Sequence, residues 1–425
     1  MKTAKVSCAA LAVFVLLVSN LAWGATAKPL YTFSSDTPGG LVFDAAGNLY
    51  GATYDGGAYG YGSVFELSPS SNGWKETVLY SFKGGTDGSA PSETERLVFD
   101  ARGNLYGTTV YGGDQSCDAG CGVVFELTPH TGRRWAERVI YSFNGLPASA
   151  PEAGLIFDAA GNLYGTTYGS YNCSTGICVG TAFELSPTSN GKWNIHILHE
   201  FGTGKNDGIG PLSVLAFDPS GNLYGTTYVG GIPNCGFGGN GCGTVFKFTP
   251  YSKGSWRYSV IWRFKGRADG DRPYAGVVSD RAGNLYGTTA LGGKNGQGCA
   301  SNAPGCGTVF ELLPNSNGTW TQGTIHTFAG YPKDGGLLFD GLVLDRAGNV
   351  FGTTHSAGAS NVGAVFELSP RSTGWHETLL YNFTRSKVGF FPNAGLILDS
   401  AGNLYGTDLG TFNSAGVAFE VTLQR

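Results

Sequence analysis

In this chain of 425 residues, four aspartates in the connections between consecutive repeat units are each followed directly by glycine: Asp87, Asp207, Asp269 and Asp334. If the fold brings their carboxylates together, they could bind a metal ion or a polar ligand. Carboxylate oxygens are the ligands that Ca²⁺ prefers, so Ca²⁺ is the ion they suggest, although no resident cofactor is predicted. Asp-Gly is also an ordinary turn sequence, because Asp hydrogen-bonds its own backbone and Gly adopts positive φ. Both interpretations stay open, and the turn is the simpler one.

A second group of candidates breaks a pattern that the rest of the chain repeats. Asp408 stands where other copies have Thr, His355 follows the sixth copy, and Asp271 stands directly before Arg272. A residue that occupies the same place in every copy serves the fold, whereas a binding site in a single chain has to be asymmetric. Asp408, His355 and Asp271 are therefore candidate ligand-binding groups.

Aromatic side chains in long loops form the third group, and Tyr59, Tyr171 and Tyr274 belong to it. Such rings could stack on sugars or anchor a protein partner. Catalytic motifs are not found: none of the six histidines stands in a His-x-x-x-His setting, and there is no Gly-x-Ser-x-Gly, phosphate loop or dinucleotide fingerprint. The sequence therefore favours binding over catalysis.

Three recurring patterns must position these residues. The run Asp-x-x-Gly-Asn-Leu-Tyr-Gly occurs seven times, with Val-Phe for Leu-Tyr in the sixth copy. Each copy is followed by a run that resembles Val-Phe-Glu-Leu, and six copies are then followed by a stretch from Trp to Phe, such as 74–82. The asparagines of the first pattern are Asn48, Asn104, Asn162, Asn222, Asn284, Asn349 and Asn403.

Each unit predicts four strands, which in the first unit are 41–43, 48–54, 64–67 and 74–82. Repeated units of four strands are typical of β-propellers. The seventh Trp-to-Phe stretch is missing at the C-terminus, but residues 30–33 at the N-terminus have the same ending. The sequence thus predicts an all-β fold, a seven-bladed β-propeller of four-stranded blades closed by an N-terminal strand that completes the last blade.

The connections predict two unequal faces. The turns between the first and second strands, and between the third and fourth, are short. The connections between the second and third strands and between consecutive units are long, and in an up-and-down blade both emerge on one side. Because loops on a rigid scaffold usually carry function, the candidate site is expected on that face.

The N-terminus has the features of a secretory signal. Two lysines precede an apolar stretch at 6–23, and small residues follow, so residues 1–27 are expected to be removed and 28–425 to form the propeller domain. A cut around Gly24 is equally compatible. No second long apolar segment follows, so no membrane span is expected after cleavage.

The cysteines also indicate export, to the extracellular space or the periplasm. Cys8 belongs to the signal, and the other eight form four close pairs that we interpret as disulfides. Half of a zinc site is the competing interpretation of the first pair. The pairs are Cys117 with Cys121, Cys173 with Cys178, Cys235 with Cys242, and Cys299 with Cys306.

Charge narrows the range of partners. Without residues 1–27 the chain has 25 basic and 31 acidic residues, a net charge of −6. Nucleic acid requires a basic surface, so no nucleic-acid partner is expected. A polysaccharide or a protein remains a candidate ligand, and a monomer is expected.

The run Gly-Asn-Leu-Tyr-Gly-Thr-Thr followed by Val-Phe-Glu-Leu resembles the GloVer tandem repeats of exported bacterial proteins, over essentially the whole mature chain. That resemblance implies export and a repeat array, but no activity and no catalytic residues. The Asp-x-x-Gly-Asn-Leu-Tyr run is also similar to the turn of NHL and lactonase-type propeller repeats, which include enzymes with a metal at the channel mouth. We therefore expect a binding or scaffold propeller, with a metal-assisted hydrolase or lyase as the alternative.

Overall fold

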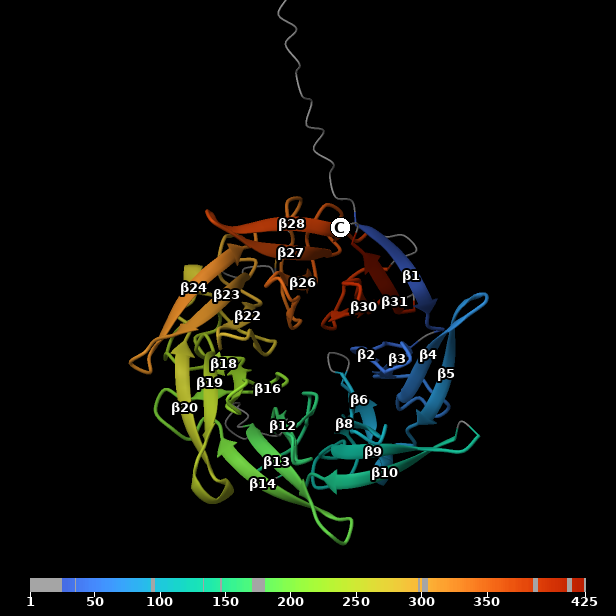
Figure 1. The fold of residues 1–425 in the computed structure, drawn as a ribbon. Helices are drawn as coiled ribbons and strands as arrows, with labels where there is room; N and C mark the ends of the chain where they lie inside the picture. The colour runs from blue at the N-terminus through green and yellow to red at the C-terminus, as the bar shows by residue number, and fades with distance from the viewer. Residues whose placement is uncertain are drawn as a thin grey trace, which may run out of the picture.

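The computed structural model describes residues 25–423 apart from 35, 93–95, 133, 146, 170–179, 297–298, 300–304, 385–388 and 411–414. Seven antiparallel sheets stand around a central axis, and the chain passes through them in order (Figure 1). The fold is a seven-bladed β-propeller, as the sequence predicts.

The innermost strands have two residues each. They are β2 (Val42–Phe43), β7 (Val98–Phe99), β11 (Ile156–Phe157), β16 (Ala216–Phe217), β21 (Val278–Ser279), β25 (Val343–Leu344) and β29 (Ile397–Leu398). The second strands are β3 (Leu49–Thr53), β8 (Leu105–Tyr111), β12 (Leu163–Thr167), β17 (Leu223–Thr227), β22 (Leu285–Thr289), β26 (Val350–Thr354) and β30 (Leu404–Asp408).

The third strands are β4 (Ser63–Ser70), β9 (Val123–His130), β13 (Thr181–Pro187), β19 (Thr244–Pro250), β23 (Thr308–Pro314), β27 (Ala364–Arg371) and β31 (Val417–Thr422). The outer strands are β5 (Gly73–Ser81), β10 (Arg134–Ser142), β14 (Trp193–Glu200), β20 (Trp256–Arg263), β24 (Trp320–Thr327), β28 (Gly374–Asn382) and, for the seventh blade, β1 (Thr26–Thr32). We number the blades from β2–β5 as the first.

A few short elements stand in the loops. Strand β6 (Ser89–Pro91) pairs with β8, and β15 (Gly208–Ile209) pairs with β18 (Val229–Gly230). The 3₁₀ helices of the described residues are η1 (Gly85–Asp87), η2 (Ser252–Gly254) and η3 (Arg267–Asp269). No helix in the described part of the chain has the length and apolar character to cross a membrane.

The recurring Asp-x-x-Gly-Asn-Leu-Tyr run forms the hairpin between the two inner strands of each blade. In the first blade Asp44 Oδ1 accepts hydrogen bonds from the backbone N–H groups of Ala46 (2.8 Å) and Asn48 (2.9 Å). Its Oδ2 accepts from Asn48 Nδ2 (2.8 Å) and from the hydroxyl of Tyr50 (3.3 Å). Gly47 has φ of 87°, which L-residues avoid. This arrangement is an Asx turn, and it accounts for four of the recurring residue types.

The glycine of the second strand is required by the third strand. A Cβ atom at Gly225 would lie 2.4 Å from Cζ of Phe246, which is closer than two carbon atoms can approach. The same contact recurs between Gly51 and Phe65 (2.6 Å) and between Gly406 and Phe419 (2.8 Å). Gly in the second strand and Phe in the third are therefore one packing unit.

Adjacent blades meet through a pair of phenylalanines. One ring follows the outer strand of a blade, the other belongs to the third strand of the next blade, and the centroids are 4.9–5.3 Å apart. The pairs are Phe33–Phe65, Phe82–Phe125, Phe143–Phe183, Phe201–Phe246, Phe264–Phe310, Phe328–Phe366 and Phe383–Phe419. All these rings are buried, so the core consists of seven equivalent layers between blades.

The N-terminal strand closes the ring. Strand β1 lies along β31 beside the C-terminus (Figure 1), with pairs from Thr26–Thr422 to Thr32–Val417. The borrowed-strand prediction is confirmed, and the strand begins earlier than residue 30. Residues 1–24 of the expected signal peptide lie outside the described residues, so its boundary stays a prediction. Thr26 and Ala27 also pair in the sheet, with Thr422 and Val421.

Candidate functional site

The long connections emerge on one face, which we call the loop face. In the first blade residues 54–62 join β3 to β4, whereas two residues join β4 to β5. The alternating strand directions place the connections between second and third strands, and between consecutive blades, on the same side. This arrangement is the one predicted from the loop lengths.

A chamber of about 510 Å³ occupies the centre of the ring. The inner strands of all seven blades, or the residues just before them, contribute to its wall. The wall residues with polar or charged side chains are Arg96, Tyr274 and Asp340. Most of the others are apolar, and they include Leu41, Val98, Ile156, Ala216, Val278, Leu342 and Ile397. A mostly apolar cavity of this size with a few polar groups is typical of a small-ligand site.

Arg96 and Asp340 make the chamber asymmetric. Asp340 stands at the place of Ala153, and Arg96 at the place of Gly154, in the run that precedes each inner strand. Asp340 is 5% exposed; its Oδ2 accepts from Thr353 Oγ1 (2.7 Å), and its Oδ1 has no hydrogen-bond partner among the described residues. Burial raises the pKa of Asp340 to about 7, against the effects of the Thr353 hydrogen bond and the Arg96 charge.

Neither Arg96 nor Asp340 is among the candidates predicted from the sequence, although the sequence contains a signal for both. The preceding run reads Ala-Gly or a similar small pair in most blades, and these two positions break it. The filter that selected Asp408 and His355 applies equally to this run.

A continuous row of rings borders the chamber, and we call it the aromatic arc: Tyr228, Tyr274, Phe339, His355 and Phe391. Successive centroids are 5.7, 5.3, 5.1 and 5.2 Å apart, and the last pair is stacked at 26°. All five rings are half-buried, and Tyr274 and Phe339 are part of the chamber wall. Two predicted site residues, Tyr274 and His355, are therefore brought together.

Arg272 extends the arc toward solvent. Its Nη1 donates to the hydroxyl of Tyr228 (2.7 Å), and its guanidinium carbon lies 4.9 Å from the centroid of the Tyr228 ring and 5.3 Å from that of Phe237. At the other end, Nδ1 of His355 lies 3.2 Å from the carbonyl oxygen of Pro392, and burial lowers the pKa of this imidazole. Neutral His355 therefore acts as one more ring in the arc.

The carboxylates of Asp87, Asp207, Asp269 and Asp334 are not among the described residues of the chamber wall. Asp87 accepts from the hydroxyl of Tyr80 (2.6 Å) and from the backbone N–H of Lys83 (2.7 Å), both at the end of outer strand β5. Oδ2 of Asp207 likewise lies 2.9 Å from Nε2 of His199, at the end of outer strand β14. Asp269 and Asp334 accept from backbone N–H groups just after β20 and β24. Each of the four carboxylates thus lies at the start of its loop, beside the end of an outer strand.

Asp271 and Asp408 are buried beneath loops and do not belong to the described chamber wall. Asp271 Oδ2 accepts from the backbone N–H of Phe237 (3.1 Å), which fixes the loop that carries Phe237. Asp408 Oδ1 accepts from Gly410 N (2.9 Å), and burial raises the pKa of Asp408 to about 8. Both carboxylates therefore organise loops.

The remaining predicted aromatic residues have different positions. Tyr59 is 58% exposed in the loop between β3 and β4, apart from the arc. Tyr171 lies outside the described residues. Tyr61 and Phe237, which are 48% and 42% exposed, also present rings on the loop face.

Three of the four predicted disulfides are present in the described residues: Cys117–Cys121, Cys235–Cys242 and Cys299–Cys306. Cys173 and Cys178 lie outside the described residues. The second cysteine of each described pair is fully buried just before a third strand, so each bridge covers the loop end of a core layer. Three disulfides fit an oxidising, exported environment.

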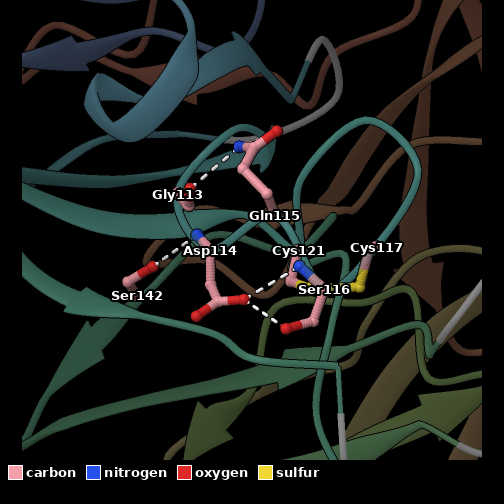
Figure 2. The surroundings of a disulfide bond; sticks show 7 residues. All are labelled: Gly113, Asp114, Gln115, Ser116, Cys117, Cys121 and Ser142. Carbon is pink, nitrogen blue, oxygen red and sulfur yellow. Dashed lines mark hydrogen bonds between the residues drawn. A yellow bond between two sulfur atoms is a disulfide. The ribbon is translucent and has the colours of Figure 1, made fainter.

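The surroundings of the first bridge show how a loop is held (Figure 2). The backbone N–H of Asp114 donates to Ser142 Oγ of β10 (2.9 Å). The Asp114 carboxylate accepts from the backbone N–H (2.9 Å) and from the hydroxyl of Ser116. The loop is thus tied to the outer strand at one end and cross-linked at the other.

A family model described as the Gloeobacter/Verrucomicrobia repeat matches residues 22–237 and, overlapping them, 115–300. None of the curated proteins matches the chain in sequence.

Several solved structures are similar to this chain at low sequence identity. A candidate 6-phosphogluconolactonase from Bacteroides uniformis is 16% identical with a TM-score of 0.49, and the alignment covers 80% of this chain and 83% of that one. A candidate oxidoreductase (glucose dehydrogenase) from Thermus thermophilus is 13% identical with a TM-score of 0.41, over 94% and 100%. A protein of unknown function from Dyadobacter fermentans is 9% identical with a TM-score of 0.41, over 93% and 98%. No activity is transferred from them.

Proposed function

This chain belongs to the Gloeobacter/Verrucomicrobia repeat family, and with that membership as premise we propose that it is an exported, extracellular or periplasmic protein that binds a polysaccharide chain on its loop face. The observation that carries the proposal is the aromatic arc at the border of the chamber. Its rings come from blades four to seven, so the arc is asymmetric within a symmetric ring, as a binding site should be.

The chemistry of the arc suits sugars. Half-buried rings offer apolar surface against which the C–H faces of a pyranose can pack, with polar groups at the edge for hydroxyls. Arg272 supplies donors at one end, and the hydroxyl groups of Tyr228 and Tyr274 lie along the row. The chamber beside the arc has room for the end of a chain.

The chamber wall favours binding over the alternative, a metal-assisted hydrolase or lyase at the channel mouth. Among the described residues of that wall, Asp340 is the one carboxylate, and the wall includes no histidine. A metal centre there would need a further set of ligands. Arg96 belongs to the same wall, and its positive charge disfavours the binding of a cation there.

The test is a glycan array followed by calorimetry with a captured oligosaccharide. We expect Tyr274→Ala to weaken binding by at least about tenfold, because it removes one of the two rings that belong to both the arc and the chamber wall. Tyr251→Ala is the matched control: Tyr251 is 60% exposed but stands between β19 and β20, on the opposite face. We expect the control to bind as the unmodified protein does.

Two outcomes contradict the proposal. If no glycan is captured while a protein partner is, the loop face is a protein-binding surface. If glycans bind but Tyr274→Ala and Tyr251→Ala lose equally little affinity, the sugar site lies elsewhere.

A further inference from the structure

The outer edges of adjacent blades meet through a recurring set of three positions, which we call a rim junction. The first position is two residues before the Phe that follows an outer strand, and the second is in the loop after that strand. The third position is two residues after the Trp of the outer strand in the next blade. Between the first and second blades these residues are Tyr80, Asp87 and Glu137. Between the third and fourth blades they are His199, Asp207 and Tyr258.

The junction between the fifth and sixth blades differs in chemistry, because all three positions offer metal ligands. His326 is on β24, Asp334 follows in the loop, and Glu377 is on β28. Nε2 of His326 lies 3.3 Å from Oδ2 of Asp334 and 3.5 Å from Oε1 of Glu377. The three donor atoms lie within 4.8 Å of one another.

These distances match the edges of a coordination tetrahedron. Zinc bonds of about 2.1 Å to nitrogen and oxygen place neighbouring ligand atoms about 3.4 Å apart. The ring of His326 is held by an edge-to-face contact with Phe328, with centroids 4.5 Å apart, so Nε2 stays directed at both carboxylates. Oε1 of Glu377 is buried and has no hydrogen-bond partner among the described residues.

A protonated imidazole explains the cluster less well. Nε2–H has one proton and faces two carboxylate oxygens, and both separations exceed the roughly 2.7–2.9 Å of charge-assisted hydrogen bonds. The third-to-fourth junction shows what an ordinary bond looks like here. Nε2 of His199 lies 2.9 Å from Oδ2 of Asp207, and the hydroxyl of Tyr258 donates to Oδ1 (2.5 Å).

We propose that His326, Asp334 and Glu377 form a divalent metal site that takes Zn²⁺ and joins the outer strands of the fifth and sixth blades. An imidazole ligand selects Zn²⁺ over Ca²⁺ and Mg²⁺, which prefer sites made of oxygen atoms alone. Three protein ligands leave a fourth position for water, and the side chains are 13–20% exposed, so solvent reaches the site. The ion links two strands from different blades with the loop between them, which makes it an interblade clamp.

The experiment uses the untagged, oxidised full chain, stripped with a chelator and titrated with Zn²⁺ by calorimetry and by competition with a chromophoric chelator. We expect one ion per chain and a higher Tm with Zn²⁺ than without it, and no binding of Ca²⁺ at the same concentration. His326→Gln and Glu377→Gln should each weaken binding at least about tenfold. His199→Gln is the matched control, because its junction lacks the third ligand, and its zinc affinity should be unchanged.

A gain of function provides the converse test. Tyr80→His would place an imidazole beside Asp87 and Glu137, so that variant should bind a second Zn²⁺. The proposal is overturned if the protein binds no Zn²⁺ with a Kd below about 100 µM. It is equally overturned if His326→Gln still binds the ion, or if His199→Gln loses as much affinity as His326→Gln. These outcomes are independent of whether a glycan binds on the loop face.

Discussion

The closure of the ring can be tested by removing one side chain, Phe33. This residue directly follows β1 and is 1% exposed, and its ring contacts Tyr31 (5.2 Å between centroids) and Phe65 (4.9 Å). Phe65 belongs to the first blade, whereas β1 belongs to the seventh. Phe33→Ala therefore removes the aromatic contact across the one junction that joins the two ends of the chain.

The expected loss of stability is large for a residue so near a terminus. Truncating a buried Phe to Ala costs about 3–5 kcal/mol through lost burial and the cavity that remains. Each edge-to-face ring pair contributes about 0.5–1.5 kcal/mol of that sum. Leu41, Leu49 and Ala418 pack in the same cluster and are fully buried, so the cavity cannot fill with water at low cost.

The assay is urea denaturation followed by tryptophan fluorescence, with Phe264→Ala as the reference. Phe264 has the same position between the fourth and fifth blades, 5.0 Å from Phe310, far from either terminus in sequence. We expect the two variants to lose similar free energies of unfolding. If Phe33→Ala costs less than about 1 kcal/mol while Phe264→Ala costs the full amount, β1 frays as an ordinary terminus and the ring does not depend on it.

Three further predictions concern the channel, the blades and the loops. Burial raises the pKa of Asp340 from 3.8 to about 7, so between these two pH values the folded state holds a proton that the unfolded chain releases, and the free energy of unfolding falls as pH rises. In urea titrations, the free energy of unfolding of Asp340→Asn relative to that of the unmodified protein should therefore be higher at pH about 8 than at pH about 5. Parallel pH profiles would contradict that reasoning. Gly225→Ala should cost at least about 1–3 kcal/mol, measured by thermal unfolding, because its Cβ would lie 2.4 Å from Phe246, whereas Gly341→Ala, with no atom within 4 Å, should be nearly neutral. Replacing Cys235 and Cys242 together by Ser should cost about 2 kcal/mol, and adding reductant should then no longer lower the Tm through that bridge.

The fold could be predicted from the sequence because each recurring residue type has one local task that is repeated. Asp44 organises a hairpin through both carboxylate oxygens, and Gly51 leaves room for the ring of Phe65. Such tasks depend on residues a few positions apart or in the adjacent strand. The same patterns, counted at both ends of the chain, were sufficient to identify the closing strand.

The site was less predictable because sequence spacing does not give radial position. Asp207 and Asp334 lie in loops that run from the outer edge to the channel, but they stand at the start of those loops and stay at the rim. Asp340 was detectable as a break in a run of small residues. His326 and Glu377 belong to different blades, and their contact follows only from the register between two outer strands.

The pairing of residue 26 with residue 422 also means that the seventh blade cannot be completed before the whole chain has been made. The first strand to be synthesised has no partner until the last strand is complete, so six blades can form while the seventh waits. During that interval β1 presents unpaired backbone groups and the first blade an uncovered apolar surface at Phe65, and both are prone to association with other chains. A contact of such long range is slow to form, and the rate of ring closure therefore sets how long a newly made chain stays vulnerable to aggregation.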